Sequence, residues 1–182
     1  MVRMASIFLY ILLSVVSCSI LDDKLSIDKE YNDSDKLRLN GYYYFKYGED
    51  ENTRLVIYFF YKNGVLFHAG APLATEVEEN ENSLKDSSFY GGTMKSKARW
   101  GIYNISGDTI AFERWYPSTG SLPAYVRSGK ILNDTTFVIT ESYRMRFGRK
   151  WEYDQEYRVY HFREFKHKPD STNPFIDSLI TD

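Results

Sequence analysis

The chain contains few of the residues from which most catalytic and metal sites are built. Its 182 residues include one cysteine and three histidines. One cysteine excludes an intrachain disulfide, and His68, His161 and His167 lack the spacing of metal ligands. No phosphate-binding loop, dinucleotide fingerprint, G-x-S-x-G or H-E-x-x-H motif is present. The sequence therefore predicts no metal site, no cofactor and no enzymatic activity.

An excess of one charge and a long apolar run are missing as well. The formal net charge is −2, which gives no electrostatic basis for binding nucleic acid. The apolar run from Ala5 to Val16 is shorter than the roughly 20 residues that span a bilayer. With Arg3 before it, the run is typical of the apolar core of an export signal.

The single cysteine follows this run, in Val15-Val16-Ser17-Cys18. This ending resembles the lipobox of bacterial lipoproteins. The resemblance implies that residues 1–17 are a signal peptide, that Cys18 carries lipid, and that the lipid anchors the protein to a membrane. Ser19 stands where an aspartate would favour retention in the inner membrane. We therefore expect a cell-envelope protein on the outer membrane of a Gram-negative bacterium, at its periplasmic face or the cell surface.

Composition divides the remaining chain into three parts. Residues 18–38 are rich in Asp, Lys, Ser and Asn, which is typical of a linker, and we expect a lipid-anchored tether. Residues 39–166 are long enough for one domain with its own core. Residues 167–182 contain two prolines and many turn formers, so we expect an irregular tail.

The domain is rich in strand-forming aromatics, with 16 Tyr and 12 Phe in the chain. Short runs of such residues alternate with turn residues such as Asn63-Gly64 and Gly107-Asp108. Residues 74–88 interrupt the pattern and are either a short acidic helix or a mobile loop. The sequence thus predicts an all-β fold, an eight-stranded antiparallel up-and-down barrel. The expected strands are 39–47, 54–61, 64–69, 96–104, 109–116, 123–132, 135–143 and 153–165.

The two ends of this domain are similar to those of the lipocalin-like (calycin) barrels. In that family a Gly-x-Trp on the first strand packs beneath an arginine of the last strand. This chain has Gly41-x-Tyr43 near the start and Arg163 near the end, so a tyrosine replaces the tryptophan. The resemblance implies that Arg163 lies over the Tyr43 ring as a cation–π pair that closes the barrel floor.

A predicted hairpin provides the candidate ligand-binding residues. A three-residue loop at 133–135 predicts four cross-strand pairs with all eight side chains on one face: Ile131 with Phe137, Gly129 with Ile139, Arg127 with Glu141, and Tyr125 with Tyr143. That face is apolar near the turn and polar and aromatic farther away, as in a packed barrel end that leads into a polar cavity. With the neighbouring hairpin it contributes Arg114, Tyr116, Tyr125, Arg127, Glu141 and Tyr143. The alternative is that this face is the outside and that Arg127–Glu141 is a surface ion pair.

Two functions remain open from the sequence. The first is binding of a small polar or amphipathic molecule inside the barrel, favoured by the tyrosine-rich polar face. The second is an envelope structural or protein-interaction role for a barrel whose interior is filled. The acidic segment 74–88 and the loop 117–123, next to Trp115 and Tyr116, would then contact a protein partner.

Overall fold

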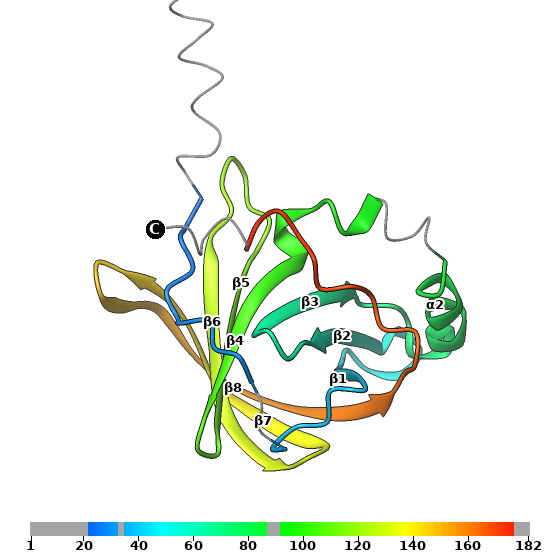
Figure 1. Ribbon diagram of the computed structural model, residues 1–182. Helices are drawn as coiled ribbons and strands as arrows, with labels where there is room; N and C mark the ends of the chain where they lie inside the picture. Colours follow the sequence, from blue (N-terminus) through cyan, green and yellow to red (C-terminus); the bar gives the residue numbers. More distant parts are fainter. Residues whose placement is uncertain (1–21, 33–34, 87–91, 177–182) are drawn as a thin grey trace, which may run out of the picture.

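The computed structural model describes residues 22–32, 35–86 and 92–176. Eight antiparallel strands close into a barrel in up-and-down order, and the last strand pairs with the first (Figure 1). This confirms the predicted fold class. The strands are β1 (Gly41–Tyr47), β2 (Arg54–Phe60), β3 (Val65–Gly70), β4 (Trp100–Ser106), β5 (Thr109–Trp115), β6 (Ala124–Asn133), β7 (Thr136–Arg146) and β8 (Arg149–Glu164).

Aromatic rings fill the middle of the barrel. Phe137 and Tyr160 stack with ring centroids 4.5 Å apart, and Tyr43 lies 5.2 Å from Phe137. Phe60 meets Tyr103 edge-on at 4.9 Å. Side chains alternate along each strand, so these rings share the inner face, where they form a buried cluster. Residues near the β6–β7 turn therefore point inward, as the alternation predicts.

A second core lies on the outside of β1 to β4. It contains Tyr42, Ile57, Phe59, Phe67 and Trp100, all buried. A helix, α2 (Val77–Ser83), covers part of this surface through Val77, after a 3₁₀ turn at Ala74–Glu76. Of the two predictions for 74–88, the short acidic helix is therefore the one that the structure confirms. Because β2 contributes alternate side chains to the inner cluster and to this outer core, it is buried on both of its faces.

The N-terminal segment is not the free linker that its composition suggests. Asp23 pairs with Arg144 at 2.5 Å, and its backbone carbonyl accepts a hydrogen bond from Trp115 Nε1 at 2.7 Å. Leu37 is buried in the inner cluster. A few specific contacts hold this polar segment against the barrel, and the composition of the segment does not reveal them. The described parts of the expected tether, 22–32 and 35–38, thus lie along the barrel.

The C-terminal tail is irregular, as predicted, but it is ordered against the barrel. Ile176 is buried in the outer core, where Phe165 contacts Tyr42 and Phe59. Asn173 Oδ1 accepts hydrogen bonds from the amides of Phe175 and Ile176 at 3.1 and 3.0 Å. The tail, red in Figure 1, therefore acts as a strap across the outer core.

Candidate functional site

The inner face of the barrel changes character from one end to the other. Near the β6–β7 turn it is apolar, with Ile110 and Phe137 buried. Toward the opposite end the same face carries charged residues. On β5, Phe112 is followed by Arg114, and Phe112 is paired with Arg127 on β6. We call this charged region the polar end; it comprises Tyr58, His68, Arg114, Tyr116, Arg127, Glu156, Arg158 and Tyr160.

Arg114 is buried and well supplied with acceptors. Its Nη1 donates to the carbonyls of Ala98 and Trp115 at 2.8 and 3.0 Å, and its Nε lies 3.3 Å from Tyr58 Oη. Its guanidinium also lies 3.7 Å from the centre of the Tyr116 ring. Arg114 is therefore a fixed part of the barrel wall that contributes one positive charge to the interior.

Arg127 is half-buried, and most of its donors are unused. Its Nε is 3.5 Å from Glu156 Oε1, while Glu156 Oε2 is 2.9 Å from Arg158 Nε. The first contact is an ion pair but no hydrogen bond, and Arg127 Nε and Nη1 lack hydrogen-bond partners among the described residues. The hydroxyl of Tyr160, a residue with 0% exposure, is also without a partner there. Such groups normally pair in native structures, so this region is suited to a ligand that accepts hydrogen bonds.

Positive charge dominates this end of the barrel. Arg127 and Arg158 both contact the carboxylate of Glu156, and Arg114 and Arg127 both lie over the Tyr116 ring. The His68 ring lies 5.0 Å from the Tyr58 ring, and the positive charge near it affects its pKa. Its burial, together with the charges of Arg114, Arg99 and Arg127, holds the pKa of His68 well below 6.5. A neutral histidine beside three arginines leaves the site cationic.

Four of the six predicted binding residues come together in the structure. Arg127 lies over the Tyr116 ring at 4.9 Å, beside Arg114, and the Tyr116 and Tyr125 rings meet edge-on at 5.5 Å. Tyr125 is at the rim, where its hydroxyl donates to Glu152. The alternation on β5 and β6 thus predicts that these four residues lie near one another, and in the structure they do.

The predicted pairing of Arg127 with Glu141 is wrong. Gly129 pairs with Ile139 as expected, but the register then shifts, so that Ser128 pairs with Glu141. A β-bulge of this kind moves every later side chain to the other face. Glu141 instead accepts a hydrogen bond from Ser128 Oγ at 2.6 Å and pairs with Lys150 at 2.8 Å, and Lys150 lies over the Tyr143 ring at 4.1 Å. Glu141 and Tyr143 lie outside the polar end.

The polar end also contains residues that sequence reasoning missed. Glu156, Arg158 and Tyr160 lie at alternate positions of β8 and contact Arg127 or the inner rings. Strict alternation within 156–160 would have grouped them, because Phe137–Tyr160 and Ile139–Arg158 pair in regular order and the register shifts only beyond Ile139. Tyr58 and His68 face inward from β2 and β3, whose alternation is hidden by burial on both faces.

The cation–π pair that the resemblance implies at the barrel floor, Arg163 over Tyr43, does not form in the structure. Arg163 is opposite Tyr42, and Tyr43 is opposite Phe162, so Arg163 and Tyr43 lie on different faces. Arg163 points outward and pairs with Glu81 at 2.8 Å. The cation–π contact at this end is instead Arg38 over Phe162 at 4.7 Å.

Gly41 does belong to the closure, through backbone packing. A Cβ at Gly41 would be 2.1 Å from the carbonyl oxygen of Arg163, too close for any side chain. Tyr43 closes the floor from within, because its hydroxyl donates to the Asp134 carbonyl at 2.7 Å. Burial then raises the pKa of Tyr43, with the Asp134 contact adding to the effect.

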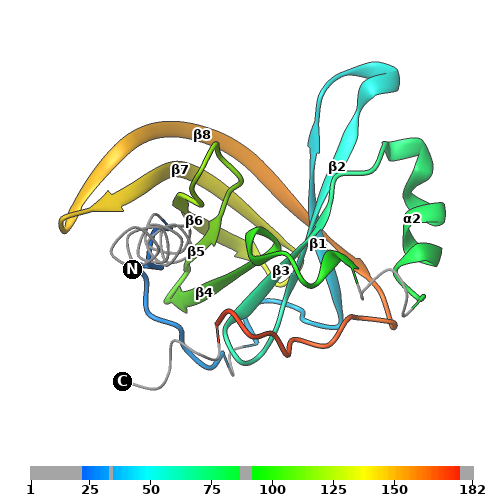
Figure 2. The same ribbon diagram turned by 90° about the horizontal axis from the view of Figure 1, so that it is seen from above.

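A groove lies beside the polar end and shares Arg158 with it. β1 pairs with β8 only from Gly41–Glu164 to Tyr44–His161, and beyond that point the two strands diverge. The β1–β2 and β7–β8 hairpins leave the barrel in different directions (Figure 2). A groove of about 520 Å³ lies between them. Its lining includes Phe45 and Arg158 of the inner face and Tyr47 and Tyr157, both exposed.

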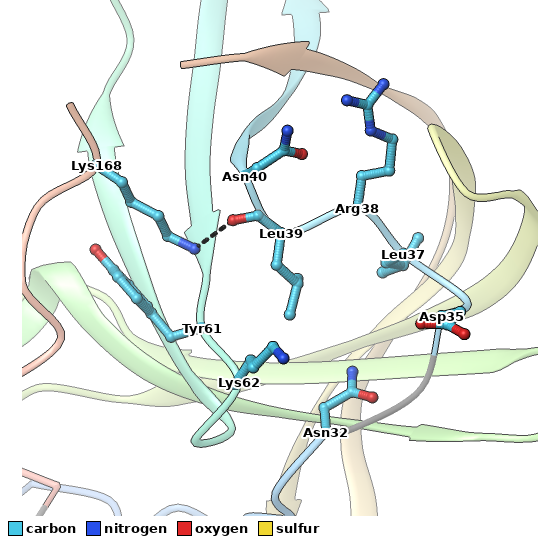
Figure 3. Close-up of a pocket in the computed structure, with 9 residues that line it drawn as sticks. All are labelled: Asn32, Asp35, Leu37, Arg38, Leu39, Asn40, Tyr61, Lys62 and Lys168. Atoms are coloured by element: carbon cyan, nitrogen blue, oxygen red, sulfur yellow. Dashed lines mark hydrogen bonds between the residues drawn. The ribbon is translucent and has the colours of Figure 1, made fainter. Parts of the chain in front are cut away.

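A second pocket, of about 720 Å³, lies near the opposite end of the barrel. Figure 3 shows the nine residues that line it: Asn32, Asp35, Leu37, Arg38, Leu39, Asn40, Tyr61, Lys62 and Lys168. Lys168 Nζ donates to the carbonyls of Leu39, at 2.9 Å, and Phe60, and lies 4.2 Å from the Tyr61 ring. Burial lowers the pKa of Lys168 to about 8. Its donors are used within the protein, so it fastens the tail to the barrel floor.

Two further observations bear on sequence expectations. Cys18 and the signal-like residues 1–17 lie outside the described residues, so the structure leaves the lipidation prediction as it stands. Within the described ranges, no cluster of three or more His, Cys, Asp or Glu side chains has metal-binding geometry. Nor does any helix in those ranges have the length and apolarity that a membrane span requires.

Comparison of the chain with protein-family models, with curated proteins and with solved structures finds no match to any of them.

Proposed function

We propose that this protein is a membrane-anchored envelope lipoprotein whose lipocalin-like barrel binds a small amphipathic anion. The anchor part of the proposal rests on the lipobox-like sequence that ends at Cys18. The ligand part rests on one observation: the surplus of arginine at the polar end, with unpaired donors on Arg127 and Tyr160. A carboxylate or phosphate head group would accept hydrogen bonds from these donors and offset the charge.

The groove beside the polar end suggests the rest of the ligand. Phe45, Tyr47 and Tyr157 line it with aromatic rings, while Arg158 lies at its inner side. A ligand with an apolar body and an acidic head would pack its body against the rings and direct its head toward Arg127. The proposal thus narrows the polar or amphipathic ligand predicted from the sequence to a negatively charged one.

Calorimetric titration of the full chain with dodecanoate and with dodecyl phosphate tests the proposal. Dodecanol, which has the same chain length without the charge, is the matched control ligand. We expect either anion to bind more tightly than dodecanol, and Arg127→Met to weaken anion binding about 10- to 100-fold. Lys130→Met removes an exposed cation from the same strand and should leave binding unchanged. Equal binding of dodecanol, or no binding of either anion, would refute the proposal.

The filled interior favours one other function. Phe60, Phe112, Phe137 and Tyr160 occupy the middle of the barrel and are all fully or almost fully buried. A barrel packed in this way also suits a structural or protein-interaction lipoprotein of the envelope. Absence of anion binding, together with one stoichiometric partner after crosslinking in membranes, would favour this second function.

A further inference from the structure

The β7–β8 hairpin extends well beyond its neighbours. The last pair between β6 and β7 joins Val126 and Tyr143, whereas β7 and β8 continue to pair as far as Arg146 and Arg149. Residues 144–151 therefore form a two-stranded arm that projects from the barrel (Figures 1 and 2). The sequence predicts strands that stop at 143 and resume at 153, so the arm is a feature that only the structure reveals.

The tip of this arm exposes large aromatic side chains. Phe147 is 100% exposed and Trp151 is 56% exposed. With Arg146 and Arg149 they line a shallow groove of about 410 Å³. Phe147 has a φ of 49° and Gly148 a φ of 71°, the left-handed conformations of a tight hairpin turn. Asparagine or glycine suits such a turn better than phenylalanine, so folding does not account for the residue at position 147.

The same tip is positively charged. Residues 145–151, Met-Arg-Phe-Gly-Arg-Lys-Trp, contain three cations and no acid. Lys150 pairs with Glu141, but Arg146 and Arg149 form no ion pair with any described residue. Arg146, Arg149 and Trp151 share one face of the arm, because Arg146 pairs with Arg149 and Trp151 with Arg144. Aromatic rings and free guanidinium groups are thus presented together.

We propose that this arm tip, residues 146–151, binds the surface of a membrane that contains anionic phospholipid. Aromatic side chains are favoured at the level of the head groups, and arginine binds phosphate in a bidentate manner. A lipid surface fits better than a protein partner because the tip is a narrow projection. A stable protein interface buries about 800 Å² on each partner, which is more than a two-residue turn and its flanking residues present.

The position of the N-terminal segment supports this orientation. Asp23 binds Arg144 at the base of the arm through contacts of 2.5 and 2.8 Å. If Cys18 carries lipid, Asp23 lies five positions after the anchor, a reach of at most about 18 Å. The anchor would then hold the arm close to the bilayer. The arm proposal does not depend on the barrel ligand, and its test does not require the lipid.

Tryptophan fluorescence of the full chain provides that test. Of the three tryptophans, Trp100 and Trp115 are buried, so only Trp151 is accessible. With vesicles of brominated phosphatidylcholine and about 30% phosphatidylglycerol, we expect Trp151 emission to shift to the blue and to be quenched. Neutral vesicles, or about 0.5 M salt, should greatly reduce both effects. Vesicle attachment through the N-terminal apolar run would not require anionic lipid or Arg146 and Arg149, so neutral vesicles and the variants below distinguish it from binding by the arm.

Substitutions at the tip make the test specific. The double variant Arg146→Gln/Arg149→Gln should weaken partition of the arm about 30-fold. Phe147→Asn should lower quenching without loss of fold, since asparagine suits the turn. Lys130→Gln removes a cation far along the barrel wall and should change nothing. Unchanged Trp151 emission on anionic vesicles that carry bound protein, or equal quenching on neutral vesicles or in the double variant, would overturn the proposal.

Discussion

Arg114, which is buried, and Arg127, which is half-buried, are neighbouring arginines with different environments. Arg114 donates to two backbone carbonyls, whereas Arg127 contacts Glu156 as an ion pair and leaves Nε and Nη1 without hydrogen bonds. Removing one partner of a well-bonded buried pair costs about 3–5 kcal/mol of folding free energy. The loss should be smaller for Arg127, because Glu156 keeps its contact with Arg158.

This difference gives a prediction for Arg127→Met. We expect the free energy of unfolding to fall by less than about 1 kcal/mol, because little bonding is lost and a desolvated charge is removed. Urea denaturation of the wild type and the variant, without ligand, measures the change. A loss above about 3 kcal/mol would mean that Arg127 is structural and would argue against its role in anion binding.

His68 makes stability depend on pH. Its folded-state pKa lies below the unfolded value of 6.5 because of burial and the nearby arginines, so the folded protein binds fewer protons than the unfolded chain. The stability that depends on neutral His68 is therefore complete above pH 6.5. It is lost below that value, at about 1.4 kcal/mol per pH unit, until the folded-state pKa is reached.

The variant His68→Asn should remove this dependence. Between about pH 7.5 and about pH 5.5, the wild type should lose more unfolding free energy than the variant, as measured by chemical denaturation. His161→Asn, at an exposed position on β8, is the control and should follow the wild type. Parallel curves for the wild type and His68→Asn would contradict the assignment.

Single residues also set the limit of what the sequence can predict about the site. Alternation correctly assigned Arg114, Tyr116 and Arg127 to one end of the barrel interior. It failed at Glu141 because one extra residue in a strand reverses the faces, and no residue type marks the bulge near Thr140. Bulges depend on how neighbouring strands fit together, which lies beyond the local pattern.

At the level of elements, the N-terminal segment is bound more firmly than its composition suggests. Glu113 on the outer face of β5 is 1% exposed and accepts hydrogen bonds from Ser26 N at 2.5 Å, Ser26 Oγ at 3.0 Å and Ile27 N at 3.0 Å. Burial raises the pKa of Glu113, although these donors oppose the rise. One carboxylate thus fastens the segment to the barrel wall.

We therefore predict that Glu113→Ala releases this segment selectively. The two amides lose their acceptor, at a cost of about 1–3 kcal/mol. Hydrogen exchange should accelerate over residues 22–32 while the strands remain protected. Glu164→Ala, which removes only the partly exposed ion pair with Arg38, should leave exchange in the segment unchanged. Protection equal to that of the wild type in Glu113→Ala would show that other contacts suffice.

Elements with clear local signals were predictable, and those without were not. Turn residues such as Asn63-Gly64 marked the strand ends near 60 and 65. The β7–β8 turn at Phe147-Gly148 has an aromatic residue where such turns favour Asn or Gly, and so the arm was missed. The packing of 22–32 on the barrel was also missed, because tertiary contacts rather than composition hold it.

At the level of the whole molecule, the barrel and the proposed anchor are separable features. Cys18 precedes every residue that the structure describes, and no described contact depends on it. We predict that Cys18→Ser leaves thermal stability and the circular dichroism spectrum unchanged but moves the protein from the membrane to the soluble fraction. Fractionation of cells that express both forms measures this. A variant that remains in the membrane fraction would contradict lipid anchoring through Cys18.

The fold class was predictable because several signals agreed. Strand-forming aromatics, regular turns and the length of the domain all indicated an eight-stranded antiparallel barrel, which the structure confirms. The surrounding layer was not predictable in the same way. The outer core joins β1–β4, α2, the N-terminal segment and the tail, and such long-range contacts leave no periodic trace in the sequence.

The seam between β1 and β8 has a consequence for how the chain acquires its structure. Gly41 pairs with Glu164, so the barrel closes through contacts between residues more than a hundred positions apart. Bringing such distant segments together is slow, because the entropy of the intervening loop is lost before the contacts form. Closure also requires the last strand, so a chain still missing β8 keeps the edge of β1 unpaired. The barrel can therefore close only after β8 has been made, and until then the unpaired edge of β1 is open to pairing with other chains.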